Sequence, residues 1–136
     1  MQRKIKNRNS GSFPQIGKIA DNQLDIILDI PGATLRNWRS ADNHKATMYW
    51  TLKAITKDEL LEYKKDGVEN GVDKISDKEL QENLGIPMST LVSWRKKESR
   101  RHDLYKTLKA MSIHKLISHI EDGEKIKKLA QEQNRV

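Results

Sequence analysis

Apolar residues recur along the chain at the spacing of amphipathic helices, in short runs separated by polar turns. In the first run, Leu24, Ile27 and Leu28 lie three and four residues apart and predict a helix. Together with three further runs, this pattern predicts short helices over about 21–28, 33–40, 44–55 and 57–67. No segment shows the sustained alternation of a strand, so we expect an all-α protein.

The same pattern returns 56 residues later. Residues 18–67 and 74–123 align without a gap, and 19 of their 50 aligned positions are identical. The longest blocks of identity are Ile30-Pro31-x-x-Thr34-Leu35-x-x-Trp38-Arg39 with Ile86-Pro87-x-x-Thr90-Leu91-x-x-Trp94-Arg95, and Tyr49-x-Thr51-Leu52-Lys53-Ala54 with Tyr105-x-Thr107-Leu108-Lys109-Ala110. A fixed-period repeat predicts that each copy is one supersecondary unit with its own apolar face. We therefore expect two tandem units of about four short helices each, 18–67 and 74–123, joined by a linker over 68–73.

Local signals mark where several of these helices begin and end. Thr56-Lys57-Asp58-Glu59 and Ser76-Asp77-Lys78-Glu79 have the pattern of a capping box at a helix N-terminus. The first helix of the second copy is followed by Gly85, and the matching position in the first copy is Asp29. Both residue types tolerate a positive φ, so we expect a tight turn after each first helix.

In the second copy, the second and third helices are expected over about 89–97 and 100–111. The fourth helices are expected to be capped at Gly67 and Gly123, followed by a separate C-terminal helix over 124–136. Residues 1–17 are polar and basic and lack a helical period, so we expect a flexible arm there.

The composition adds a charge argument. The chain has 136 residues, a formal net charge of +7 and no cysteine. The excess positive charge suggests an anionic partner, and it lies mainly over 1–18, with five cations and no acid, and over 75–112, which sum to +3. The lack of cysteine excludes disulfides and thiolate metal sites, and no apolar stretch is long enough for a membrane span. We expect no membrane contact and a cytoplasmic, nucleoid-associated location.

The first two predicted helices of each copy have the pattern of a helix-turn-helix. In the second copy, the positions where that motif buries apolar groups are filled by Leu80, Leu84, Ile86, Leu91 and Trp94. The inward-facing pair on the second helix leaves its opposite side exposed, and in such motifs this side enters the major groove of DNA. That side carries Met88, Ser89, Val92, Ser93 and Lys96 in the second copy, and Gly32, Ala33, Arg36, Asn37 and Ser40 in the first.

The stretch Ile-Pro-Met-Ser-Thr-Leu-Val-Ser-Trp-Arg-Lys-Lys over 86–97, followed by a basic tract and an apolar helix, resembles the DNA-binding domain of phage-type repressors of the lambda and Cro class. Its Trp-Arg ending also resembles transposase-like and homeodomain-like helix-turn-helix modules. The resemblance covers about 20 residues well in each copy and the rest of each unit loosely. It implies sequence-specific binding of duplex DNA, usually as a two-fold arrangement.

The two copies are expected to contribute differently to DNA binding. Arg36 can form two hydrogen bonds with guanine and Asn37 two with adenine, so the first copy has the better base readers. The second copy has a dense cationic tract over 95–101, which suits contacts with DNA phosphates. Together the expected DNA-binding residues are Gly32, Ala33, Thr34, Arg36, Asn37, Arg39, Ser40, Lys45, Met88, Ser89, Thr90, Val92, Ser93, Arg95, Lys96, Lys97, Arg100 and Arg101.

Several features have plainer interpretations. Trp38 and Trp94 each lie three residues after a leucine and are expected to pack inward rather than stack on bases. Asp21, Asp25 and Asp29 lie four residues apart on one predicted helix, which supplies too few ligands for a hard cation. No nucleophile with a base, glycine-rich phosphate loop or carboxylate pair stands out. We expect no enzyme, cofactor, metal site or small-molecule substrate.

The sequence thus predicts a sequence-specific double-stranded DNA-binding protein, a transcriptional regulator of phage or mobile-element type with two recognition helices. Two units in one chain would form a built-in dimer, and a homodimer through the C-terminal helix is a further arrangement. One alternative is a DNA-packaging or partition adaptor that nucleates a nucleoprotein assembly. Another is a protein-interaction module without DNA binding.

Overall fold

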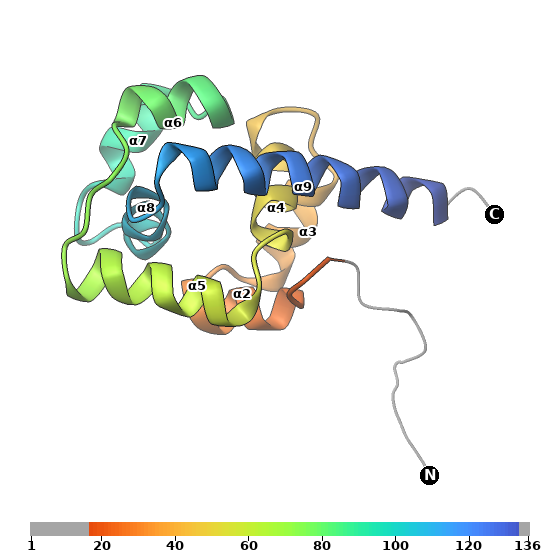
Figure 1. The fold of residues 1–136 in the computed structure, drawn as a ribbon, viewed down its shortest axis with the longest axis horizontal. Coiled ribbons are helices and arrows are strands. Elements are labelled where there is room, and N and C mark those ends of the chain that lie inside the picture. The colour runs from red at the N-terminus through yellow and green to blue at the C-terminus, as the bar shows by residue number, and fades with distance from the viewer. Residues whose placement is uncertain (1–16, 134–136) are drawn as a thin grey trace, which may run out of the picture.

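The computed structural model describes residues 17–133, which form helices and turns without a strand (Figure 1). The elements are α2 (Asp21–Leu28), α3 (Gly32–Arg39), α4 (His44–Lys53), α5 (Lys57–Lys64), the π-helical turn η1 (Lys65–Glu69), α6 (Asp77–Leu84), α7 (Met88–Trp94), α8 (His102–Lys109) and α9 (Ile113–Gln133). The expected all-α class is confirmed for this part of the chain. The expected basic arm over 1–17 lies outside the described residues, except for Gly17.

The two predicted capping boxes and the two predicted turns are confirmed. Thr56 and Ser76 each exchange two hydrogen bonds with the glutamate three residues later, which completes both capping boxes. Asp29 and Gly85 both adopt the left-handed conformation, with φ of 57° and 76°. Their backbone N–H groups donate to carbonyl groups of the preceding helices, so both helix pairs turn in the same way.

α7, the second helix of the second repeat, is shorter than expected. α7 ends at Trp94 rather than near Lys97, and α8 begins at His102 rather than Arg100. The residues between the two helices form a run of turns, in which the N–H of Lys96 donates to the carbonyl oxygen of Ser93 at 3.3 Å. This bond spans three residues instead of the four of an α-helix, and it ends the helix. Lys96 therefore lies in the turn and not on the exposed side of α7.

Gly67 and Gly123 do not cap the fourth helices, and that expectation was wrong. Gly67 lies inside η1 and Gly123 lies inside α9, and neither has a positive φ. A Cβ atom on Gly67 would collide with the carbonyl oxygen of Lys106, and one on Gly123 would lie 2.6 Å from that of Trp50. The glycines therefore permit a close approach between helices. As a result α9 continues without a break through 124–133, where a separate helix was expected. The last three residues of that expected helix, 134–136, lie outside the described residues.

The fourth helix of each repeat packs on the third helix of the other repeat. α5 and η1 lie along α8, and α9 lies along α4 (Figure 1). The two glycine contacts are equivalent in the repeat, since Gly67 matches Gly123 and Lys106 matches Trp50. A contact made reciprocally between equivalent residues is the property of a two-fold arrangement. One hydrophobic cluster contains apolar side chains from both repeats.

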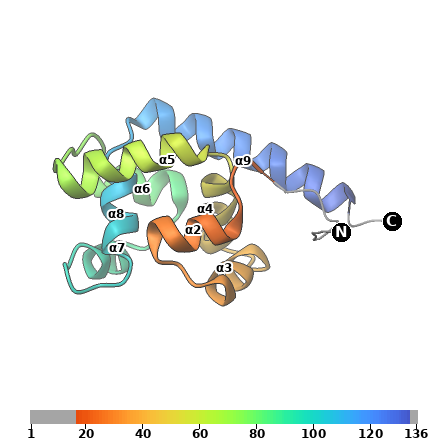
Figure 2. The same ribbon diagram turned by 90° about the horizontal axis from the view of Figure 1, so that it is seen from below.

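Both views of the molecule agree with an approximate two-fold rotation between the repeats. In Figure 1, the equivalent helices lie on opposite sides of the centre: α2 and α6, α3 and α7, and α4 and α8. In Figure 2, α5 and α9 lie along one face, and α3 and α7 lie at the opposite face. Tyr63 of α5 and its equivalent on α9, His119, meet near the axis. Within residues 17–133, no helix has both the length and the apolar character needed to cross a membrane.

Candidate nucleic-acid interface

The helix pairs α2–α3 and α6–α7 each bury one side of their second helix. Leu35 and Leu91 are fully buried, Trp38 is 7% exposed, and Trp94 is half-buried against the core. The prediction that both tryptophans pack inward is therefore confirmed. The opposite sides of α3 and α7 are left exposed, on the face of the molecule away from α5 and α9 (Figure 2).

The structure places most of the expected base-reading residues on these exposed sides. Those that are exposed are Ala33, Arg36, Asn37, Met88, Ser89, Val92 and Ser93. Thr34 and Thr90 are half-buried, and Gly32 begins α3. The hydroxyl group of Ser40 donates to the carbonyl oxygen of Arg36 at 3.1 Å, so this residue completes the end of α3.

Several of the expected DNA-binding cations contact other parts of the protein. The guanidinium group of Arg39 lies 5.7 Å from the centre of the Trp50 ring. Arg95 donates to the carboxylate of Asp77, and Arg100 lies 3.7 Å from that of Asp29.

Three of the expected lysines are exposed and form no ion pair within the described residues. Lys45, Lys96 and Lys97 take part in none of the ion pairs found between residues 17 and 133. Because Arg95 is engaged with Asp77, the tract over 95–101 presents fewer free cations than its composition suggests.

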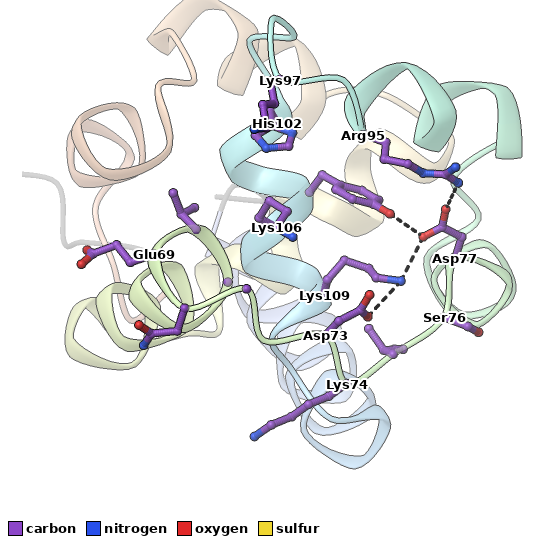
Figure 3. A pocket seen from close by; sticks show the side chains of 16 residues that line it. Glu69, Asp73, Lys74, Ser76, Asp77, Arg95, Lys97, His102, Lys106 and Lys109 are labelled. Carbon is purple, nitrogen blue, oxygen red and sulfur yellow. Dashed lines mark hydrogen bonds and ion pairs between the residues drawn. The ribbon is translucent and has the colours of Figure 1, made fainter.

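A polar cluster that sequence reasoning missed occurs once in each repeat. In the second repeat, the carboxylate of Asp77 accepts hydrogen bonds from the Tyr105 hydroxyl at 2.8 Å and the Lys109 ammonium at 3.1 Å (Figure 3). In the first, Asp21 accepts from Tyr49 at 3.0 Å and Lys53 at 2.9 Å. The members are identical in both copies, and that identity among polar positions was the signal that could have revealed them.

The pKa values of the two cluster lysines shift in opposite directions, because Lys53 is more deeply buried and the second cluster holds an additional acid. Burial lowers the pKa of Lys53 although Asp21 is nearby. Burial also opposes the charge of Lys109, yet its pKa is raised because Asp77 and Asp73 lie 3.1 and 3.2 Å away. Gly17 stands at the position equivalent to Asp73. The first cluster therefore holds its lysine with one carboxylate fewer.

Asp77 is held in its charged form by its donors. Burial alone would raise the pKa of this carboxyl group, but hydrogen bonds from Arg95, Tyr105 and Lys109 outweigh that effect and lower it. The cluster ties the start of α6 to α8 and to the end of α7. It therefore acts as a support for the helix pair and is not itself exposed for base contacts.

Two hollows lie beside the helix pairs. The larger is an open groove of about 1200 Å³ around the second polar cluster, bordered by the chain over 67–77 and by α8 (Figure 3). The smaller, of about 440 Å³, lies between the ends of α3 and α7. Within the described residues, no group of three or more histidine, aspartate or glutamate side chains is placed to hold a metal ion.

Comparisons of the chain with protein-family models, with curated proteins and with solved structures gave no significant match. The support for a function comes from the arrangement of the chain's own residues.

Proposed function

We propose that this protein binds duplex DNA in a sequence-specific manner, as a transcriptional regulator of phage or mobile-element type, with α3 and α7 as its recognition helices. The observation that carries the proposal is the two-fold relation between the helix pairs, with α3 and α7 on one face (Figure 2). Helix-turn-helix dimers bind DNA with this symmetry, because the two half-sites of a palindromic site are themselves related by a two-fold axis. A single chain would here provide both reading units.

The exposed side chains of α3 and α7 favour two unequal half-sites. Arg36 and Asn37 offer paired hydrogen bonds to guanine and adenine. In the equivalent places α7 has Val92 and Ser93, where an apolar side chain suits the methyl group of thymine and a hydroxyl group fits several bases. The proposed target is a quasi-palindrome with one strongly and one weakly specified half.

Phosphate contacts in this proposal come from a narrow set of cations. Lys96 and Lys97 lie in the turn directly after α7 and are exposed without an ion pair among the described residues. Each phosphate neutralised by such a cation releases counterions and steepens the fall of affinity with salt. These two lysines therefore position the weaker reading unit, while Arg36 and Asn37 on α3 specify the sequence.

Selection of bound sequences from a random duplex pool tests the proposal. We expect a single enriched site in which a guanine- or adenine-containing half is followed, at fixed spacing, by a more variable half. Enrichment of only one half-site with random flanks would contradict the role of α7. Failure to retain any duplex at low salt would contradict DNA binding altogether and would favour a protein-interaction module.

A second candidate function, a packaging or partition adaptor, is favoured by one observation. Leu61 on α5 and its equivalent Ile117 on α9 are 42% and 38% exposed, on helices that lie opposite α3 and α7 (Figure 2). An apolar pair there is suited to contacts between DNA-bound copies. Light scattering with bound duplex separates the functions: a ring or filament supports the adaptor, and a single chain or a pair of chains supports the regulator.

A further inference from the structure

The cavity between the two proposed reading units lies at the approximate two-fold axis. It is lined by Trp38, His44, Lys45, Met48, Thr90, Trp94 and Arg101. Two pairs among these are equivalent in the repeat, Trp38 with Trp94 and Lys45 with Arg101. A hollow lined by equivalent residues from both repeats must lie close to the axis that relates them. Its volume of about 440 Å³ is within the range of small-molecule binding sites.

The ionisable groups around this cavity are all basic. Lys45, Arg101 and His44 line it, and no aspartate or glutamate does. Arg101 is half-buried and takes part in none of the ion pairs between residues 17 and 133. The one hydrogen bond of its guanidinium group within these residues is a long one of 3.4 Å to the carbonyl oxygen of Asp29. Burial lowers the pKa of Arg101 and the charge of Asp29 opposes this effect, but the Asp29 carboxylate is paired with Arg100 at 3.7 Å. This partly buried guanidinium group therefore has no ion pair of its own within residues 17–133.

The walls of the cavity are aromatic as well as basic. Trp38 is almost fully buried, and its ring lies 5.6 Å from the guanidinium carbon of Arg101. Trp94 lines the same hollow from the other repeat. Indole rings pack well against planar groups, through stacked or edge-to-face contacts. The larger groove in Figure 3 differs, because the carboxylates of Asp73 and Asp77 already pair with its buried lysine.

We propose that this cavity binds a small molecule in which a planar ring carries a carboxylate or phosphate group. The ring lies between the two indoles, and the oxyanion accepts hydrogen bonds from Arg101 and Lys45. This assigns Arg101 to a ligand rather than to the DNA backbone. Because α3 and α7 each contribute a tryptophan to the walls, occupancy fixes the separation of the two recognition helices. This last consequence rests on the proposed function, whereas ligand binding does not.

Nuclear magnetic resonance of the indole N–H groups tests binding in the absence of DNA. The three tryptophans give three signals, and Trp50, which does not line the cavity, is the internal control. Phenyl phosphate and benzoate are the probes, with inorganic phosphate and cyclohexanecarboxylate as controls without an aromatic ring. We expect phenyl phosphate or benzoate to shift the signals of Trp38 and Trp94 to saturation while the signal of Trp50 stays in place.

Variants identify the anion contact. Lys45→Gln and Arg101→Gln are each expected to weaken probe binding about tenfold, the usual loss for one charge-assisted hydrogen bond. Arg36→Gln, an exposed arginine outside the cavity, is the matched control and should bind the probes as the natural protein does. Since Lys45 is exposed, its variant is expected to fold even if the Arg101 variant does not.

Two results would overturn the proposal. One is the absence of a saturable shift at Trp38 and Trp94 with either ring probe at about 10 mM, where even a millimolar site would be filled. The other is equal affinity for inorganic phosphate and phenyl phosphate, which would identify a phosphate site served by the DNA backbone. If the probes bind, their effect on duplex affinity is measured next. A lack of DNA binding would then contradict the proposed function and leave the ligand site intact.

Discussion

Tyr63 and His119 occupy equivalent positions in the two repeats and contact each other. The hydroxyl group of Tyr63 lies 3.1 Å from Nε2 of His119, and the rings meet edge to face with centroids 5.8 Å apart. Residues that contact their own equivalents lie near a two-fold axis, so this pair marks where the exchanged helices α5 and α9 meet. His119 is 6% exposed, and its Nδ1 atom has no hydrogen-bond partner within the described residues.

This burial predicts a dependence of stability on pH. Burial lowers the pKa of His119, and the nearby charges of both signs do not reverse that effect. The unfolded chain therefore takes up a proton near pH 6.5 while the folded protein still resists it. The free energy of unfolding is expected to be constant above about pH 7.5 and to decrease as the pH falls below about 6.5 toward the folded-state pKa.

Urea unfolding of His119→Gln and His114→Gln between about pH 7.5 and 5 measures this contribution. The first variant should lose the part of the pH-dependent step that His119 contributes and keep only that of His44, whose pKa is also lowered by burial. The second should keep the full step because His114 is exposed. If both variants showed the same loss of stability as the pH falls, a group other than His119 would be responsible.

Gly123→Ala tests the close approach of α9 to α4. Helix propensity alone predicts that alanine stabilises the middle of a helix by about 1 kcal/mol. The structure predicts the opposite sign, because the new Cβ atom would lie 2.6 Å from the backbone oxygen of Trp50. Displacing a backbone carbonyl group in a packed core is expected to cost about 3 kcal/mol, measured as a lower midpoint of thermal or urea unfolding.

Gly32→Ala is the matched control, since an added Cβ there meets only the end of the Arg36 side chain at 3.5 Å. Its stability should stay within about 0.5 kcal/mol of the natural protein or rise slightly. A Gly123→Ala variant as stable as this control would disprove the close packing of the exchanged helix.

The two polar clusters predict unequal costs for removing their aspartates. In Asp21→Asn, the ammonium group of Lys53, whose side chain is 4% exposed, loses its carboxylate partner. In Asp77→Asn, Lys109 keeps Asp73 at 3.2 Å. Breaking a buried pair is therefore expected to cost about 3 kcal/mol in the first variant and about 1 to 2 kcal/mol in the second.

Chemical unfolding of these two variants and of Asp25→Asn, an exposed aspartate on the same helix as Asp21, gives the comparison. Acid adds a second check, since a lowered carboxyl pKa stabilises the fold above about pH 4 and the benefit is lost as the pH falls through the folded-state pKa. Asp77→Asn should show a weaker loss of stability in acid than the natural protein. Equal costs for the two variants would contradict the supporting role of Asp73.

DNA binding predicts different effects for the two kinds of contact. Arg36→Ala is expected to weaken binding of the selected site by about 1 to 3 kcal/mol and to relax the base preference at one position. Lys96→Gln with Lys97→Gln is expected to weaken binding of all duplexes alike and to reduce the slope of affinity against salt by about 2. Filter binding of selected and scrambled duplexes over a salt series measures base preference and salt slope. If Arg36→Ala changed the salt slope and the lysine variant changed the base preference, the assigned roles would be reversed.

The sequence predicts the local features well because their causes are local. Both capping boxes and both left-handed turns depend on residues within four positions of one another, and all four are present in the structure. The inward positions of Trp38 and Trp94 follow equally from helical spacing.

The features that the sequence did not predict depend on contacts between distant segments. A glycine near an expected helix end indicates a cap, and only the crossing with Trp50 or Lys106 shows that Gly123 and Gly67 serve packing instead. Arg95 looks like a phosphate-binding residue until its bond to Asp77, 18 positions earlier, is known. The tryptophan-lined cavity likewise needs both repeats to be placed against each other before it exists.

The exchange of the fourth helices would hold the two repeats together even if the chain were cut over 70–72. A protease cut there would leave two fragments, and each would carry a helix whose apolar side is covered mainly by the other fragment. The pair should stay together in solution and reassemble after denaturation. Such a chain corresponds to a domain-swapped homodimer whose two copies are joined in one polypeptide. Such a fusion keeps the packing between the repeats the same while the exposed residues of α3 and α7 differ from each other.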